Sequence, residues 1–192
     1  MESVMDVANY LCNEYEKISG EKLDEMKLHK LLYFIQRENI VVKGEPMFSE
    51  EFEGWEYGPV CPDVRERFYQ GEIIGNAKEI SWESVCIVND VLSRYGDLES
   101  WKLSEMTHKE SSWINARTGL MSDEYGCVTL KFSDIKKDAE NIPKAEYENI
   151  KENIYILGNK TNYEHILKSL DELKSGKTIV KTIKELEEMA DE

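Results

Sequence analysis

Hydrophobic positions recur at three- and four-residue steps through much of the chain and predict a mainly α-helical protein. Ser3 stands where a helix N-cap is needed and Gly20 where the helix should end. A second helix should run from about Asp24 to Gly44, and it should be central to the core because apolar residues cover much of its girth. The apolar stripe of the first helix is the clearest in the chain: Val4, Val7, Ala8, Leu11, Cys12, Tyr15 and Ile18.

Aromatic and polar residues alternate between residues 45 and 60, among glycines, prolines and glutamates. This pattern is typical of one or two short strands or an ordered loop, so we expect a short β-hairpin or extended segment near residues 47–58. Further helices are predicted at 62–70, 81–95, from Asp97 onward and around Trp113, and a helix or turn at 131–140.

The C-terminal segment is lighter in composition, since Tyr163 is its only aromatic residue. Two T-x-x-E capping boxes, at Thr161 and Thr182, predict two helices, and the sequence KTIVKT between them should be extended. We therefore expect a helical domain over residues 1–155 and a helix–strand–helix arm over residues 156–192.

Charge narrows the choice of partner. The chain has 39 acidic and 24 basic residues, for a net charge of −15. Such a charge repels phosphate backbones, so we do not expect DNA binding, whereas it suits a basic protein partner. The alternative is that the acidic residues only keep the protein soluble.

Location and cofactors follow from what the sequence lacks. The start, MESVMDVANY, has no signal-peptide pattern, and no apolar run is long enough to cross a bilayer, so we expect a cytoplasmic protein without a membrane partner. The four cysteines are scattered without C-x-x-C spacing, which predicts neither a zinc site nor a disulfide framework. We expect no cofactor.

Catalytic motifs are also missing. No phosphate loop, dinucleotide fingerprint or H-E-x-x-H motif occurs, and the three histidines are far apart in sequence. His29 and His108 are interpreted as structural, the latter as a partner for the last carbonyls of a helix. One enzyme hypothesis is a hydrolase that pairs His108 with Cys61 or Cys127. Without a nucleophile motif we expect no enzyme and no catalytic or metal site.

Two stretches of the chain carry distinctive motifs. The first stretch holds MKLHKLLYFIQ, GEPMF and FEGWEYGPVCPDV, and its motif residues are Leu28, Lys30, Leu31, Tyr33, Gly44, Pro46, Phe48, Phe52, Trp55, Tyr57, Gly58, Pro59 and Val60. The second stretch holds Leu103, Met106, Thr107, His108, Glu110, Trp113, Ala116 and Arg117. In type and order these residues resemble a known family, the SocA-like antitoxin domain, also called the Panacea domain, which has proline at the position of Ser112. The resemblance covers residues 3 to about 140.

This resemblance implies a helical antitoxin that binds a toxin, in a phage or mobile-element setting. Some members of the family resemble adaptors that hand a bound toxin to a protease. We interpret the motif residues mainly as structural, with the two tryptophans as buried anchors: Tyr33, Phe48, Trp55, Tyr57, Gly58, Pro59, Thr107, His108 and Trp113.

The arm resembles the toxin-binding tails of RelB- and Phd-type antitoxins. Its extended IVKTI could add a strand to the sheet edge of a basic, RelE/ParE-like toxin. The alternative is that the arm folds back onto its own domain. The proposed toxin-binding residues are Leu167, Leu170, Leu173, Ile179, Val180, Ile183, Leu186 and Met189.

The leading hypothesis is therefore an antitoxin of a type II toxin–antitoxin system, which neutralises its toxin by direct binding. The alternative is a proteolytic adaptor, working with a cytosolic protease, or a phage counter-defence protein that acts through the globular domain. A homodimer remains open.

Overall fold

A computed structural model describes residues 1–71, 78–121 and 123–158, together with the single positions 161, 165, 168 and 172. The chain divides into two compact units, Met1–Tyr155 and Ile156–Glu192. All of the proposed toxin-binding residues of the arm lie outside the described residues: Leu167, Leu170, Leu173, Ile179, Val180, Ile183, Leu186 and Met189.

The first two helices begin and end as the sequence predicts. In α1 (Val4–Ser19) the Ser3 hydroxyl accepts the Met5 N–H, and in α2 (Glu25–Lys43) the Asp24 carboxylate accepts the Lys27 N–H. Gly20 and Gly44 end the two helices with φ angles of 74° and 75°, which glycine adopts without steric cost.

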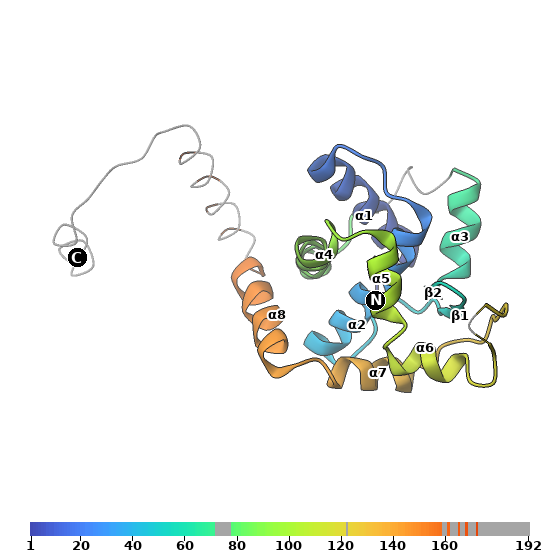
Figure 1. Ribbon diagram of the computed structural model, residues 1–192. Coiled ribbons are helices and arrows are strands. Elements are labelled where there is room, and N and C mark those ends of the chain that lie inside the picture. The colour runs from blue at the N-terminus through green and yellow to red at the C-terminus, as the bar shows by residue number, and fades with distance from the viewer. Residues whose placement is uncertain are drawn as a thin grey trace. The chain divides into compact units, whose positions relative to one another are not determined.

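The other helices follow in chain order along the first unit (Figure 1). They are α3 (Pro62–Tyr69), α4 (Trp82–Tyr95), α5 (Ser100–Thr107), α6 (Ser111–Ala116), α7 (Phe132–Glu140) and α8 (Lys144–Leu157). The prediction that a helix starts at Asp97 was wrong, because Glu99 is the N-cap of α5. The helix α8 was not predicted, although Tyr147, Ile150 and Ile154 recur at helical spacing and Ile150 is fully buried.

The core is organised around α2. Every residue from Lys27 to Ile40 is buried, and this helix packs against α1, α4, α5, α7 and the second strand. No amphipathic surface helix buries its whole circumference, so the polar residues of α2 must find partners inside the protein. Residues in both halves of α2 have such partners. Those in its N-terminal half bind the segment that forms the site described below.

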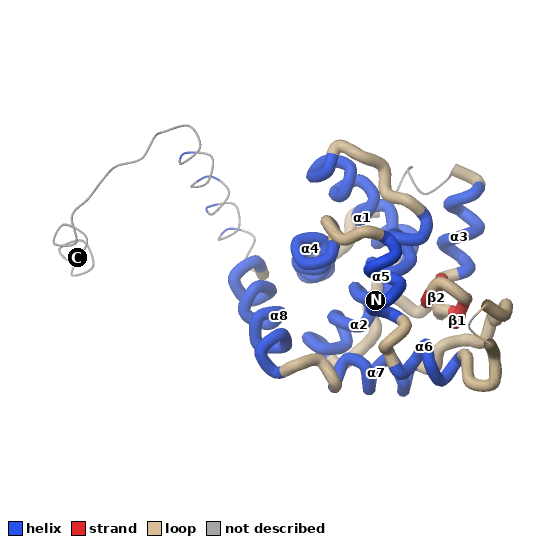
Figure 2. Tube along the Cα trace, in the orientation of Figure 1, coloured by secondary structure: helices blue, strands red, loops and turns tan. Residues whose placement is uncertain are grey.

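A small hairpin is the only sheet in the described residues (Figure 2). Strands β1 (Glu53–Trp55) and β2 (Gly58–Val60) pair antiparallel, with Gly54 opposite Pro59. The helices, together with this short hairpin, confirm the predicted mainly helical class. The hairpin lies slightly later in the chain than the expected residues 47–58. Phe48 and Phe52 precede it and are buried in the core instead of forming a strand. No helix in the described residues has the length and apolar character needed to cross a membrane.

Candidate protein-binding surface

The hairpin is fixed onto α2 and α5 by close polar contacts. Gly58 has a φ angle of 105°, and a Cβ atom there would lie 2.5 Å from the Thr107 hydroxyl oxygen and 2.7 Å from Lys30 Cε. Only glycine fits here, because a side chain would clash with these atoms and would be strained at this positive φ angle. Lys30 Nζ donates to the Pro59 carbonyl oxygen (3.1 Å), and the Ser104 hydroxyl donates to the Tyr57 carbonyl oxygen (2.9 Å). The two sequence motifs therefore meet at this hairpin.

His108 and Trp113 close the other side of the hairpin. Their rings stack with centroids 4.0 Å apart, and the Trp113 indole N–H donates to the Trp55 carbonyl oxygen (2.9 Å). His108 is also the C-cap residue of α5, and its ring bonds to the backbone of Glu56. Burial lowers the pKa of His108, so a neutral imidazole fills this position.

Tyr33 joins the motifs to α7. Its hydroxyl donates to the Asp138 carboxylate (3.0 Å), which also accepts the backbone N–H of Ser111 (2.7 Å) and of Ser112 (3.0 Å). Burial raises the pKa of Tyr33 well above its ordinary value, so the phenol stays protonated as this bond requires. The N–H of Ser112 used here is one that a proline at this position would lack.

Large aromatic side chains gather on the solvent side of the hairpin. Tyr57, Trp101, Tyr69 and Tyr125 are 44, 62, 66 and 69% exposed. Tyr57 meets Trp101 edge-on at 5.3 Å, and Tyr125 meets the half-buried Trp55 at 5.6 Å. We call this set the aromatic surface: Trp55, Tyr57, Arg65, Tyr69, Trp101 and Tyr125.

Arg65 links the parts of the aromatic surface. Its guanidinium lies over the Trp55 ring at 4.6 Å and over the Tyr69 ring at 4.9 Å, while its Nε is 3.2 Å from the Glu25 carboxylate. Tryptophan, tyrosine and arginine are the residue types that dominate the energetic centres of protein interfaces. Exposed together around one hairpin, they point to a binding role.

Comparison with known families agrees with this geometry. Residues 28–114 match the family model described as "Antitoxin SocA-like, Panacea domain". This segment is therefore similar to the SocA-like Panacea domain. The match runs from α2 to Ile114 in α6, so it includes the hairpin and both motifs. No curated protein and no solved structure matches the chain.

Within the matched segment the motif residues differ in their burial. Tyr33, Phe48 and Thr107 are fully buried, and Gly58 and Pro59 are buried in the hairpin. Trp55 and Trp113, expected as buried anchors, are each only half-buried. The Tyr57 ring is exposed and lies against Trp101, while its carbonyl oxygen accepts the Ser104 hydroxyl of α5.

Four members of the aromatic surface lie outside the motifs, and none of them was predicted from the sequence as a site residue: Arg65, Tyr69, Trp101 and Tyr125. Trp101 stands in the polar sequence ESWKLSEM, and Tyr125 stands in the loop after α6. Trp101 could have been noticed in the sequence, because it lies on the polar side of a short helix. A tryptophan on that side does not face the core, which indicates a surface role.

The residues of the hydrolase hypothesis differ in environment: Cys61 is buried, Cys127 is exposed, and the His108 ring stacks on Trp113. Burial raises the pKa of the Cys61 thiol to about 11, so thiolate is scarce near neutral pH. His108 Nε2 lies 3.4 Å from the Ser104 hydroxyl, but this hydroxyl is buried and gives its proton to the Tyr57 carbonyl oxygen. The part of the chain that the structure describes holds no cluster of His, Cys, Asp or Glu fit for a metal ion.

Proposed function

We propose that the chain is the antitoxin of a bacterial or phage type II toxin–antitoxin system, acting in the cytoplasm, and that it neutralises its toxin by direct binding. The match of residues 28–114 to a family of antitoxins is the observation that carries this proposal. The aromatic surface supports it, because a protein that works by capture needs an exposed surface rich in interface residues.

The charge of the chain indicates what kind of toxin fits. With a net charge of −15, the protein attracts a basic partner over a distance of about 8–10 Å in physiological salt. Two carboxylates also line pockets at the aromatic surface, Glu56 and Glu66. A basic toxin, for example one of RelE/ParE type, would meet both features at one place.

The arm, residues 156–192, is a second contact in this proposal. Its apolar residues are too few to form a core alone, and a toxin surface would cover them: Leu167, Leu170, Leu173, Ile179, Val180, Ile183, Leu186 and Met189. The alternative fold of the arm, back onto its own domain, would leave the aromatic surface as the main contact.

Co-expression tests the function. The product of the gene adjoining this chain's gene should stop growth when expressed alone, and the full chain should restore growth. The double variant Tyr57→Ala/Trp101→Ala should lose rescue, whereas Tyr155→Ala, which removes an exposed ring of α8, should keep it. Lack of rescue by the unmodified chain against any adjoining gene product would contradict the proposal.

A chain truncated after Gly158 separates the two contacts. If the arm is the principal contact, truncation should abolish rescue while the folded Panacea domain remains. If the aromatic surface is the principal contact, the truncated chain should still rescue and the double variant should not.

A proteolytic adaptor is the second candidate, favoured by the position of the exposed surface on the globular domain. An adaptor shortens the half-life of its cargo, whereas a sequestering antitoxin does not need a protease. The toxin half-life, measured with and without the main cytosolic protease, distinguishes the two functions.

A further inference from the structure

A pocket of about 300 Å³ opens beneath the aromatic surface. Its walls come from the start of α2, from the hairpin and from α3, and they include the rings of Trp55, Tyr57 and Tyr125. This volume lies at the lower end of the range found for small-ligand sites. Flat aromatic walls suit a ligand with a planar, apolar body.

His29 lines this pocket with an unused hydrogen-bond donor. The ring is 1% exposed, and its Nδ1 accepts the Cys61 backbone N–H at 3.3 Å. Burial lowers the pKa of His29, so the ring is neutral and its single proton is on Nε2. Nε2 has no hydrogen-bond partner and lies 3.8 Å from the Glu25 carboxylate. A buried donor without an acceptor costs free energy, and a ligand oxygen would remove that cost.

Lys30 adds further donor capacity. Its side chain is 1% exposed, and the hydrogen bond from Nζ to the Pro59 carbonyl oxygen is the one that the structure shows. An amine with two or three N–H groups can serve more than one acceptor. No carboxylate within salt-bridge distance balances this amine in the described residues, unlike Arg65, which faces Glu25.

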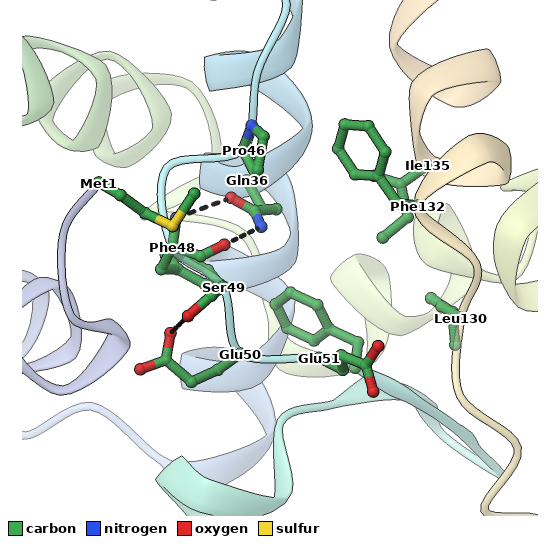
Figure 3. Close-up of a pocket in the computed structure, with 11 residues that line it drawn as sticks. Met1, Gln36, Pro46, Phe48, Ser49, Glu50, Glu51, Leu130, Phe132 and Ile135 are labelled. Atoms are coloured by element: carbon green, nitrogen blue, oxygen red, sulfur yellow. Dashed lines mark hydrogen bonds between the residues drawn. The ribbon is translucent and has the colours of Figure 1, made fainter.

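In another pocket, of about 280 Å³, the polar side chain that comes from α2 already has its hydrogen bonds within the protein (Figure 3). There the Gln36 amide donates to the Phe48 carbonyl oxygen (2.9 Å) and accepts the Met47 N–H (2.8 Å). The polar group that reaches that pocket from α2 is thus already used by the protein. In the pocket beneath the aromatic surface, by contrast, His29 Nε2 has no hydrogen-bond partner, although the carboxylates of Glu25 and Glu56 line the same pocket.

We propose that the pocket beneath the aromatic surface binds an aromatic carboxylate, whose oxygens accept hydrogen bonds from His29 and Lys30 and whose ring packs against Trp55 and Tyr125. The carboxylate can belong to a small acid or to the C-terminal aromatic residue of a polypeptide. This binding goes beyond toxin neutralisation and does not require it.

The proposal carries a pH dependence. Burial lowers the pKa of Lys30 to about 7, and a bound carboxylate should raise it, because an opposite charge favours the ammonium form. Binding should therefore take up a proton near neutral pH and weaken above it. The other ionisable groups that act on Lys30 or line the pocket with it are Asp24, Glu25, His29, Glu56, Arg65 and His108.

Calorimetry of the full chain with benzoate and indole-3-acetate tests the proposal. Each acid should bind at least tenfold more tightly than its amide, benzamide or indole-3-acetamide, and proton uptake should appear as a dependence of the heat on the buffer. The Lys30 Cε resonance should move toward that of the charged amine as ligand is added. This last measurement needs no variant.

Variants give the residue assignment. Lys30→Met and His29→Phe should each weaken binding at least tenfold, whereas Lys102→Met, on the exposed face of α5, should leave it unchanged. The peptide Gly-Gly-Phe and its amide identify the source: binding of the free peptide more tightly than the small acids assigns the site to a polypeptide end. Equal binding of acids and amides, or no shift of the Lys30 resonance at millimolar ligand, would overturn the proposal.

Discussion

The two halves of α2 bury charge in different ways. The C-terminal half places Arg37 and Glu38 inside the protein, and both meet opposite charges. The N-terminal half places His29 and Lys30 inside the protein, and their donors are only partly used. The first arrangement holds helices together, while the second lines a pocket.

The C-terminal cluster links α2, α4 and α8 to the start of α6. Arg94 on α4 contacts Glu38, Asp90 (2.7 Å) and Glu146 (3.2 Å), the last on α8. Arg37 contacts Glu110, the N-cap residue of α6. Because charges buried this deeply are costly alone, each depends on its partner.

This comparison distinguishes buried polar groups that stabilise the fold from buried polar groups that are available to bind a ligand. Where buried charges are held in ion pairs, removing one partner should destabilise the protein. Arg37 and Glu38 each keep one atom without a hydrogen-bond partner but lie in ion pairs, whereas the unpartnered Nε2 of His29 belongs to a residue that lines a pocket. The following variants test this comparison, beginning with the largest expected effect.

Arg94→Met should lower the free energy of unfolding by about 3–5 kcal/mol, because Glu38 and Asp90 then lose the cation that both contact and Glu38 keeps only Arg37. Urea denaturation measures this loss. The control is Lys43→Met, which breaks the surface pair with Glu83 and should cost at most about 1 kcal/mol. Equal losses for the two variants would remove the structural role of the C-terminal cluster.

Gly58→Ala should cost about 2–3 kcal/mol, since it strains a positive φ angle and meets Thr107 and Lys30. Gly20→Ala shares the positive φ angle but has open space around it, so it should cost only about 1–2 kcal/mol. Thermal or urea unfolding of both variants compares them. A smaller loss at Gly58 would show that the hairpin is not held against α2 and α5.

Trp101→Ala should weaken toxin binding by about 2 kcal/mol, roughly 30-fold, with a change in stability of no more than about 0.5 kcal/mol. The ring is exposed, so the fold loses little when it is removed. Calorimetric titration with the toxin measures the affinity. Ile114→Ala, an exposed side chain of α6 outside the aromatic surface, should bind as the unmodified chain does.

Lys30→Met should change the free energy of unfolding by no more than about 1 kcal/mol near pH 7, because the lost hydrogen bond is offset by removing a buried amine. Its clearer effect is on pH dependence. The pKa of Lys30 is lowered to about 7 in the folded chain, so unfolding takes up a proton between this pH and the ordinary lysine pKa. Stability should therefore rise over that window in the unmodified chain relative to the variant. A parallel pH profile would contradict the buried-amine assignment.

The sequence predicted the structural features that depend on residues close together in the chain. The caps at Ser3, Asp24 and Gly20, and the central place of α2, follow from spacing and residue type. The partners of Arg37 and Glu38 could not be predicted, because they lie 73 and 56 residues away on other helices. The aromatic surface was missed for the same reason, since Trp101 and Tyr125 join the hairpin only in the folded chain.

The affinity of the full chain for its toxin, measured by calorimetry, tests the central claim most directly. The account predicts that Tyr57→Ala/Trp101→Ala binds at least 100-fold more weakly than the unmodified chain while retaining its melting temperature. Unchanged affinity in that folded variant would contradict a role for the aromatic surface in capturing the toxin.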